Sequence, residues 1–378
     1  MSALKSGLVH PPYKTKYRVG NWRDYERGLR NRGDVTVWFS EEAIAAWTPQ
    51  GNGRGGGQQR YSDFAIETAL TLRVVFHLSL RQAEGFVGSL LHLMGLDCGA
   101  PDHTTASRRG RTLDIALRAR VRMGPIHLIV DSTGLEIVGQ GQWAAAKHGG
   151  KGIRGWRKLH IDVAENGFIV AEEVTDSGTD DAAAVHDLLE QIEVDIERFT
   201  GDTTYDKWSV YEALAPRGTT VVVPPSKRAV GSGTDTPAGR ARDATVTRVR
   251  NVGRRQWKKE SGYHYQGRAE NTFFRYKRLL GGRLRCREPR AQAVEVRLSC
   301  NVLNVCSNSA RRSPTQSVGE FRQWHPRRCR SSGIHAPTPW SGHYPSSGIE
   351  LHAIRVQRAI EPYCGGMRPL LIPEQVGR

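Results

Sequence analysis

The stretch IHLIVDSTGL, residues 126–135, is the part of the sequence that decides the fold. Residues 126–130 are mostly apolar, and Asp131 follows where this apolar run ends. A short apolar run with small and polar residues after it predicts a buried β-strand. A lone carboxylate is costly to bury, so Asp131 is expected to lie beside water at the end of that strand.

The next segments predict that this strand is the first of a three-stranded antiparallel meander. KLHIDVA, residues 158–164, alternates between apolar and polar residues, as a half-buried strand does. GFIVAEEVT, residues 167–175, follows it after Asn166-Gly167, a dipeptide that favours a two-residue β-hairpin turn.

Helices and strands then alternate along the chain. Residues 176–196 predict a helix capped by Thr179 or Asp180, and residues 198–206 and 218–225 predict a fourth and a fifth strand with a short helix at 207–216 between them. After a basic loop, residues 267–282 predict a last helix. The apolar face of the first helix comprises Val185, Leu188, Leu189, Ile192 and Ile196, and Phe273, Phe274 and Leu280 lie on or near one face of the last.

Strand, strand, strand, helix, strand, helix, strand, helix is the element order of the ribonuclease H fold. We therefore predict an α/β core with a five-stranded mixed sheet and flanking helices. In this fold the first and fourth strands are neighbours, and the last helix packs across them. Asp131 at the end of the first strand, Asp202 at the end of the fourth and Glu270 in the last helix are then expected to converge.

Three converging carboxylates suit the cleavage of a phosphodiester bond. Two Mg²⁺ ions about 3.5 to 4 Å apart can activate the attacking oxygen and stabilise the leaving one. Mg²⁺ is held by a few carboxylates together with substrate oxygens, and it needs no histidine or cysteine ligand. We predict that Asp131, Asp202 and Glu270 are catalytic residues that bind two Mg²⁺ ions, and that Mn²⁺ can substitute.

Other acids compete for these roles, because the chain has 38 acidic residues. A single Asp after a strand is more often a cap or a turn residue, so the signal is the conjunction of three carboxylates at matching element ends. Asp162 lies in the middle of a predicted strand, Asp206 is placed to cap the helix that follows it, and Glu136 ranks below both.

The composition points to a nucleic-acid partner. The chain has 378 residues and a formal net charge of +17, which indicates a protein that meets a polyanion. Its six cysteines form neither a CxxC pair nor a regular disulfide framework, which predicts a reducing compartment. We find no signal-peptide pattern and no apolar run of membrane-spanning length, and we expect the protein inside the cell.

Composition also divides the chain. Residues 1–60 are a basic, aromatic arm that ends in a glycine-rich linker, and residues 61–118 predict three helices, with a capping box at Ser79 and Gln82 and with Asp102 as a later cap. Such helices fit a helix-turn-helix that binds DNA, but a plain helical bundle fits equally well. The catalytic domain is expected at 119–312, with a basic loop at 226–262, and residues 313–378 read as disordered. The basic residues of the third helix are Arg108, Arg109 and Arg111.

Two further segments carry basic side chains that suit DNA. KHGGKGIRGWRKLH, residues 147–160, interleaves tryptophan with basic residues, a pattern that suits backbone tracking and stacking on unpaired bases. The expected contacts in it are Lys147, Lys151, Arg154, Trp156, Arg157 and Lys158. The loop at 226–262 is too polar for a core and is expected to wrap DNA, although an ordinary solvated loop explains its composition nearly as well.

From about residue 13 to residue 312 the chain resembles the bacterial DDE transposases typified by insertion sequence five, and among them their nine-oh-three-like branch. The resemblance is carried by YSDFAIETALTLRVVFHLSLRQAEGFVGSLLHLMGL with PDHTTASRR, by DSTGLEIVGQGQWAAAKHGGKGIRGWRKLHIDV, by GDTTYD and by YHYQGRAENTFFRYKRLLGGRLR. It implies that Asp131, Asp202 and Glu270 are the metal-binding triad. It also implies that HTTASRR belongs to the segment that reads the terminal inverted repeats of a mobile element.

The family signature around the glutamate is Tyr-x2-Arg-x3-Glu-x6-Lys, and this chain departs from it at one place. Tyr263, Glu270 and Lys277 match, whereas Gln266 replaces the arginine. Gln266 can still donate hydrogen bonds to phosphate but carries no charge, and Arg268 points elsewhere on the helix. We expect Tyr263, Gln266, Arg268 and Lys277 to contact DNA, with Lys277 near the scissile bond.

The resemblance implies a transposase that cleaves DNA at the 3′ ends of its element and joins each 3′-OH to target DNA. Its partners are double-stranded DNA, as terminal repeats and as target, and a second copy in a homodimer or larger assembly. We expect it in the bacterial cytoplasm, associated with the nucleoid. The alternatives are an inactive DNA-binding relic, a structure-selective nuclease, and a metal-independent recombinase that uses Tyr263 or Tyr265 as its nucleophile.

Overall fold

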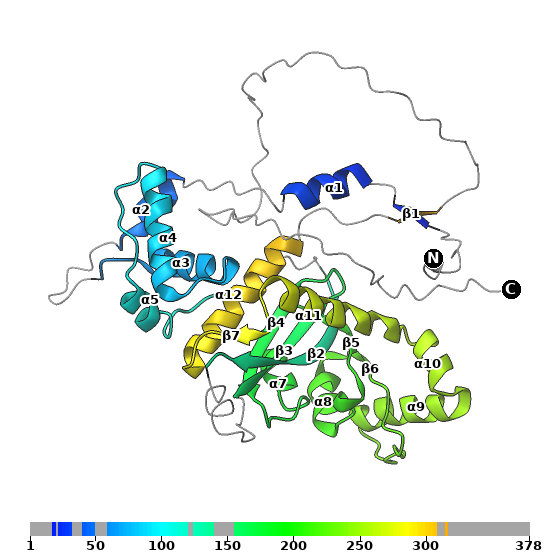
Figure 1. The fold of residues 1–378 in the computed structure, drawn as a ribbon. Helices are drawn as coiled ribbons and strands as arrows, with labels where there is room; N and C mark the ends of the chain where they lie inside the picture. Colours follow the sequence, from blue (N-terminus) through cyan, green and yellow to red (C-terminus); the bar gives the residue numbers. More distant parts are fainter. Residues whose placement is uncertain are drawn as a thin grey trace, which may run out of the picture.

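The structure is a computed structural model that describes residues 17–19, 22–31, 40–49, 59–119, 124–139, 155–307 and 314–316. Figure 1 shows a group of helices (α2–α5) on one side and a sheet with helices on both faces on the other, with the long helix α12 between them. Most of the predicted glycine-rich linker and of the predicted C-terminal tail lies outside the described residues. In the part of the chain that is described, no helix is both long and apolar enough to cross a membrane.

The three helices predicted in residues 61–118 are present as α3 (Asp63–Val75), α4 (Leu80–Leu93) and α5 (His103–Arg109). The predicted capping box is confirmed, because the Ser79 amide donates to Gln82 Oε1 at 3.1 Å. Asp102 caps α5 by accepting hydrogen bonds from the amides of Thr104 and Thr105.

The end of the predicted arm packs as part of this helical unit. Helix α2 (Glu41–Trp47) contacts α3, and Trp47 is 1% exposed. Its indole Nε1 donates to the carbonyl of Gly99 at 2.9 Å, which ties α2 to the segment before α5. Preceding parts of the arm include helix α1 (Trp22–Asn31) and strand β1 (Tyr17–Val19), which pairs with β8 (Pro314–Gln316).

The main sheet has six strands, one more than predicted. They are β2 (Ile126–Ile137), β3 (Trp156–Ala164), β4 (Ile169–Asp176), β5 (Ile196–Thr200), β6 (Thr220–Val222) and β7 (Arg283–Leu284). The strand order is β4-β3-β2-β5-β6, and β7 pairs with the far end of β2. Strands β2, β3 and β4 form the predicted antiparallel meander, and β5 lies parallel to β2. The predicted adjacency of the first and fourth strands is therefore confirmed.

Strand β2 continues past Asp131, so the prediction that this residue ends its strand is wrong. The strand runs to Ile137 because β3 pairs with it as far as Glu136 and β7 pairs with its last two residues. Its parallel partner β5, however, stops opposite Ile129, and burial along β2 falls from complete to partial at Asp131. Asp131 thus lies just beyond the end of the neighbouring strand.

The first crossover helix is shorter than predicted. Helix α7 spans only Val185–Glu190, and its N-cap is Ala184 rather than Thr179 or Asp180. The Asp180 carboxylate instead accepts from the Ala182 amide, which makes a turn before the helix starts. Ile192 and Ile196 are buried as predicted, but Ile192 follows the helix and Ile196 begins β5.

The basic segment 226–262, predicted as a loop, is largely helical. After α8 (Trp208–Leu214) and β6, it forms α9 (Pro237–Val252) and α10 (Arg254–Glu260). Thr236 Oγ1 caps α9, and Gly253, with a φ of 79°, separates the two helices. Asp206 does not cap α8 as predicted, because its carboxylate is 2% exposed and forms an ion pair with Arg242 of α9 at 2.9 Å.

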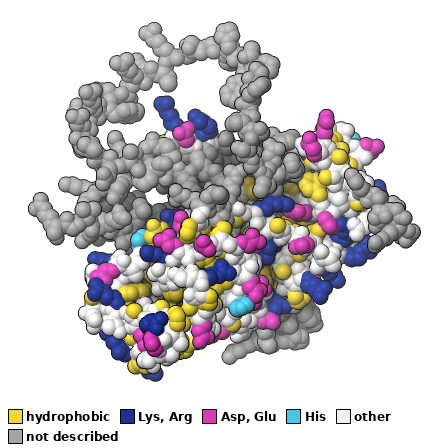
Figure 2. Space-filling model, turned by 180° about the vertical axis from the view of Figure 1, so that it is seen from behind, with side chains coloured by type: hydrophobic (Ala, Val, Ile, Leu, Met, Phe, Trp, Pro, Cys, Tyr) yellow, Lys and Arg dark blue, Asp and Glu magenta, His cyan; other side chains and the backbone are white. Residues whose placement is uncertain are grey.

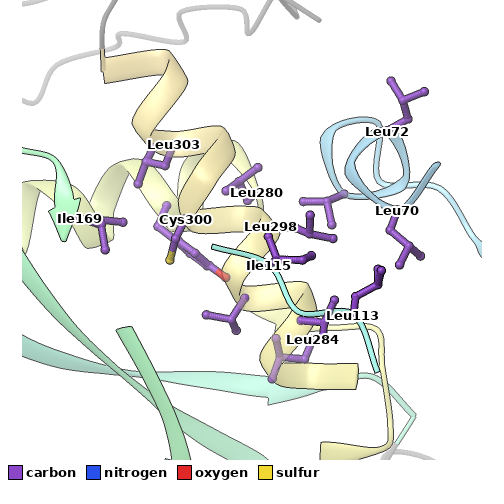
Figure 3. Close-up of a cluster of buried hydrophobic side chains, with 14 of the residues drawn as sticks. Leu70, Leu72, Leu113, Ile115, Ile169, Leu280, Leu284, Leu298, Cys300 and Leu303 are labelled. Carbon is purple, nitrogen blue, oxygen red and sulfur yellow. The ribbon is translucent and has the colours of Figure 1, made fainter. Parts of the chain in front are cut away.

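Two hydrophobic clusters cover the two faces of the sheet. Helices α11 (Gly267–Leu279) and α12 (Pro289–Ser307) pack on one face, and α7 and α8 pack on the other. Figure 3 shows α12 side chains such as Leu298 and Leu303 between the sheet and α3. Phe273 and Leu280 are buried in this cluster, whereas Phe274 is 67% exposed, so its predicted place on the packed face is wrong.

Helix α12 joins the helical unit to the sheet through buried amide side chains. Asn301 accepts from the Arg118 amide at 2.7 Å and donates to the Ala116 carbonyl. Asn304 accepts from the amide of Ile169 and donates to its carbonyl, which satisfies backbone groups at the edge strand β4. The segment after α5 and the edge of the sheet are therefore both bound to one helix.

Candidate carboxylate centre

Asp131 lies at the point of the sheet where negative charges gather. Its Oδ1 accepts from the Ser132 amide at 2.8 Å, and the side chain is only partly exposed. Burial, assisted by the charges of Asp202, Glu270 and Asp181, raises the pKa of Asp131 to about 6. Because Asp202 and Glu270 both act on Asp131, the three acids that the sequence singles out share one region of the molecule.

Asp202 follows the end of β5 and is held by the turn that it starts. Its Oδ1 accepts from the Thr204 amide at 2.8 Å and from the Thr204 hydroxyl, so it caps the 3₁₀ turn Thr203–Tyr205. Gly201, just before it, has no room for a side chain, because a Cβ there would come within 2.9 Å of Tyr205 and Val130. A glycine at this position lets Asp202 approach β2.

Glu270 lies in the first turn of α11, with its side chain exposed. The 3₁₀ turn Tyr263–Gln266 leads directly into this helix. Burial, followed by the charges of Asp202, Glu270 and Asp131, raises the pKa of Tyr263 to about 12. The phenol of Tyr263 therefore faces all three carboxylates.

The three carboxylates share one region but do not close on a single point. Among the described residues, only His186, Asp187 and Glu190 have ligand atoms that all lie within 4.8 Å of one another, and this group is exposed on the short helix α7. The oxygens of Asp131, Asp202 and Glu270 therefore spread over a wider distance. A wider arrangement suits two cations that share only some of their ligands.

Gln266 links the element that carries Asp131 to the element that carries Glu270. It is 5% exposed, and its Nε2 donates to the backbone carbonyl of Val130 at 3.0 Å. Since Val130 precedes Asp131 and Gln266 lies one helical turn before Glu270, this hydrogen bond fixes the two carboxylates relative to each other. The amide of Gln266 is thus directed into the protein.

A buried polar cluster lies on the opposite face of the same strands. Asp162 is completely buried, neither of its oxygens has a hydrogen-bond partner among the described residues, and burial raises its pKa to about 8. It lies opposite Val130 in the sheet register, on the face where Tyr205 is buried. His160, also fully buried, bonds Thr175 at 2.8 Å and lies 3.8 Å from Asp181.

Several basic residues expected to contact DNA are engaged inside the protein. Arg109 forms an ion pair with Asp63 and donates to the Tyr61 carbonyl. Arg157 pairs with Asp176, and Lys158 pairs with Asp181 at 2.9 Å; in both cases about four-fifths of the basic side chain is buried. These side chains hold elements together in the structure.

Other expected contacts are exposed. These are Arg108 and Arg111 near α5, Trp156 at the start of β3, and Arg268 and Lys277 on α11. Lys147, Lys151 and Arg154 lie outside the described residues. Of the competing acids, Asp162 is buried on the other face, Asp206 pairs with Arg242, and Glu136 pairs with Arg283 at 3.1 Å.

The donor set fits a hard divalent cation. It consists of the carboxylate oxygens of Asp131, Asp202 and Glu270, the ligand type that such cations prefer. The raised pKa of Asp131 reflects burial and uncompensated negative charge, which a cation would relieve. The sequence interpretation missed Gly201 and Tyr205, which position Asp202, because a glycine and a tyrosine in GDTTYD resemble ordinary turn residues.

Two family models match the chain, and both are described as "Transposase DDE domain". One matches residues 30–140 and the other residues 122–305, which include Asp131, Asp202 and Glu270. Among solved structures, the chain is similar to the piggyBac transposase synaptic complex with hairpin DNA, at 9% identity and a TM-score of 0.31, over 75% of this chain and 74% of that one. A likeness this distant defines neither the fold nor the activity. The two family matches together cover residues 30–305, and over this range the chain is a DDE transposase, an enzyme that cleaves and transfers DNA.

Proposed function

We propose that Asp131, Asp202 and Glu270 form the catalytic centre of this transposase and bind two Mg²⁺ ions, for which Mn²⁺ can substitute. One observation carries the proposal. The carboxylates come from a strand, a turn and a helix that are far apart in sequence, yet the charges of Asp202 and Glu270 both raise the pKa of Asp131. The charges of all three acids also raise the pKa of Tyr263. The strand order, with β5 parallel to β2 and α11 packed on them, supports a ribonuclease H-like core.

The bound metal ions would activate the attacking oxygen and stabilise the leaving 3′ oxygen. The chain's own residues place the carboxylates and the substrate. Gln266 holds β2 against α11, and Gly201 brings Asp202 close to β2. Lys277 is exposed two turns after Glu270, where it can bind a phosphate beside the scissile bond.

We assign DNA contacts to the exposed residues around this centre. Arg268 and Lys277 extend from α11, and Trp156 is 41% exposed at the start of β3. On the face drawn in Figure 2, Lys and Arg side chains are interspersed with Asp and Glu, so DNA is better located by the carboxylate centre than by a basic patch. Arg109, Arg157, Lys158 and Gln266 are not included in this surface, because they are engaged inside the protein.

We further propose that α3–α5 act as a helix-turn-helix that reads the terminal inverted repeats, with Arg108 and Arg111 exposed for DNA. The same proposal places the domain limits at residues 60, 118 and 312. It also includes a homodimer or larger assembly that brings two DNA ends together, membership of the bacterial insertion-sequence-five branch, and a location in the cytoplasm beside the nucleoid. The reaction is cleavage at the 3′ ends followed by transfer of each 3′-OH to target DNA.

The surroundings of Tyr263 argue against a tyrosine recombinase. A nucleophilic tyrosine must give up its proton readily, but burial and three carboxylates raise the pKa of Tyr263 to about 12. Its ring is also covered, because Trp257 packs at 6.1 Å between centroids and Lys258 Nζ lies 4.3 Å from the ring centre. Tyr263 is better suited to bordering the carboxylates than to attacking DNA.

Cleavage of a labelled duplex that carries the element's own terminus tests the proposal. We expect the wild type to release a 3′-OH end with Mg²⁺ and not with chelator. Glu270→Gln should bind the duplex normally and lose cleavage by orders of magnitude, because one metal ligand becomes neutral. Glu197→Gln, an exposed glutamate on β5, is the matched control and should cleave like the wild type.

Each other outcome selects an alternative. Cleavage that survives chelator with a protein–DNA adduct would establish the tyrosine mechanism. Binding without cleavage by the wild type would identify a DNA-binding relic. Cutting without any preference for the terminus, and without strand transfer, would identify a structure-selective nuclease.

A further inference from the structure

A cavity of about 280 Å³ lies between the helical unit and α12, away from the carboxylate centre. Its apolar side is formed by residues such as Leu70 and Leu298, which lie across from each other in Figure 3. Its charged lining consists of four arginines, Arg73, Arg111, Arg285 and Arg287, and two glutamates, Glu288 and Glu295, so positive charge is in excess. Guanidinium groups this close together repel one another unless opposite charges balance them.

Arg73 is the deepest of the four. It is 5% exposed, its Nε has no hydrogen-bond partner among the described residues, and its NH1 donates to Cys286 Sγ at 3.5 Å. Burial and Glu295 raise the pKa of the Cys286 thiol to about 12, so this partner is neutral. A buried charge without an opposite charge is unfavourable, and proteins rarely retain one without a use.

Glu295, a buried acid in the cavity wall, hydrogen-bonds backbone amides and forms no ion pair with a guanidinium group of the described residues. Its two carboxylate oxygens accept from the backbone amides of Arg285 and Cys286, at 2.8 to 3.1 Å. Neither Arg73 nor Arg285 forms an ion pair within the described part of the chain. Burial lowers the pKa of Arg285, and the nearby Arg73 lowers it further, although the charge of Glu295 acts in the opposite direction.

Arg111 and Arg287 are the other two arginines that line the cavity. Both are exposed, so they can meet a ligand as it enters. Arg111 follows α5, and Arg287 lies in the segment before α12. The cavity therefore has an apolar wall, a buried arginine without an ion-pair partner among the described residues, and two exposed cationic side chains.

We propose that this cavity binds a phosphate group, with Arg73 and Arg285 as its principal ligands. Guanidinium groups present paired N–H donors that match phosphate oxygens, and two of them beside an apolar wall favour a dehydrated anion. None of the acids assigned to catalysis lines the cavity, so the proposal does not depend on the function proposed for them. The phosphate can come from free phosphate or from the backbone of DNA bound across the helical unit and the core.

Isothermal titration calorimetry of the full-length protein with inorganic phosphate, at constant ionic strength, tests the site. We expect one saturable site in the wild type. Arg285→Gln should weaken it about tenfold or more, because one charged hydrogen-bond donor is lost. Arg290→Gln, which removes an exposed arginine of α12 outside the cavity, should bind like the wild type.

Arg73→Met gives a second reading, because methionine fills much of the same space without charge. It should abolish phosphate binding and the rise in the thermal unfolding midpoint that phosphate causes in the wild type. If this variant does not fold, Arg285→Gln alone decides. Absence of saturable binding in the wild type, or equal binding by Arg285→Gln and Arg290→Gln, overturns the proposal.

DNA binding measured over a range of salt concentrations separates the two sources of phosphate. If the cavity holds a backbone phosphate, Arg285→Gln should lower the slope of log K against log salt by about 0.9, and Arg290→Gln should leave it unchanged. If it holds free phosphate only, the slope stays the same while phosphate binding is lost. Neither the phosphate titration nor the salt dependence of DNA binding requires DNA cleavage, so both can be interpreted even if the carboxylate centre does not cut DNA.

Discussion

Asp162 offers a quantitative test of how the sheet beneath the carboxylate centre is built. This residue is fully buried, its two oxygens lack partners among the described residues, and burial raises its pKa from 3.8 to about 8. The folded protein therefore keeps Asp162 protonated at neutral pH, whereas the unfolded chain releases that proton near pH 4. We predict that Asp162→Asn, which has the same shape and no charge, removes this difference.

The sign and size follow from proton linkage. Because the folded state binds the proton more tightly, the wild type loses stability as pH rises from about 4 to about 8, and loses no more above that. Each pH unit is worth about 1.4 kcal/mol, so Asp162 costs the wild type roughly 5 kcal/mol over the whole range as an upper limit. Relaxation around the carboxylate reduces this, and we expect Asp162→Asn to gain about 2 to 4 kcal/mol over the wild type between pH 5 and pH 8.

Urea unfolding at pH 5, 7 and 9 measures the effect as a difference between two proteins, so other titrating groups cancel. Asp195→Asn, at an exposed aspartate before β5, provides a control with the same chemical substitution. Its stability relative to the wild type should stay level over this pH range. A gain for Asp162→Asn that is the same at all three pH values would refute the buried, protonated carboxyl.

Three other substitutions test contacts that hold the carboxylates and the first helices. Gln266→Leu removes the hydrogen bond to the Val130 carbonyl and should cost about 1 to 2 kcal/mol in urea unfolding, with slower cleavage and unchanged affinity for DNA. Gly201→Ala places a Cβ 2.9 Å from Tyr205, and it should cost about 1 to 3 kcal/mol, seen as a lower thermal midpoint, and slow cleavage. Asp102→Ala removes the cap of α5 and should cost about 0.5 to 2 kcal/mol, with weaker binding of the terminal duplex and no direct effect on the metal requirement.

Local patterns made the sheet predictable. The Asn166-Gly167 turn, the change of period from helix to strand at residue 126, and the caps at Ser79 and Asp102 all depend on neighbours in sequence, and the structure has each of them. Strand adjacency followed from the element order alone. This adjacency correctly places Asp131 beside the end of β5, the strand that precedes Asp202, although Asp131 does not end its own strand.

The sequence interpretation missed helices whose buried side chains are not apolar residues at helical spacing. Helix α9 buries only Ala238, Gly239 and Val246, so its packing leaves almost no hydrophobic pattern. Helix α12 buries polar side chains such as Asn301 and Asn304, which serve backbone groups of distant segments. No pattern within either helix indicates its partners: those of Asn301 and Asn304 lie more than a hundred residues away in the chain, and Arg242 of α9 pairs with Asp206, 36 residues earlier.

Gln266 shows why the centre itself could be only partly predicted. Compared with the family signature, it reads as a weakened phosphate contact, because a neutral amide stands where an arginine is expected. In the structure that amide is buried and bonds the strand of Asp131 to the helix of Glu270. The charges of Asp202 and Glu270 raise the pKa of Asp131, so the three carboxylates repel when no cation is bound and the protein must hold them together by other means. The tight approach at Gly201 and the bond from the Thr204 amide to Asp202 restrain Asp202 locally. The hydrogen bond from Gln266 restrains Asp131 and Glu270 by joining residues 136 positions apart, which no local sequence pattern connects.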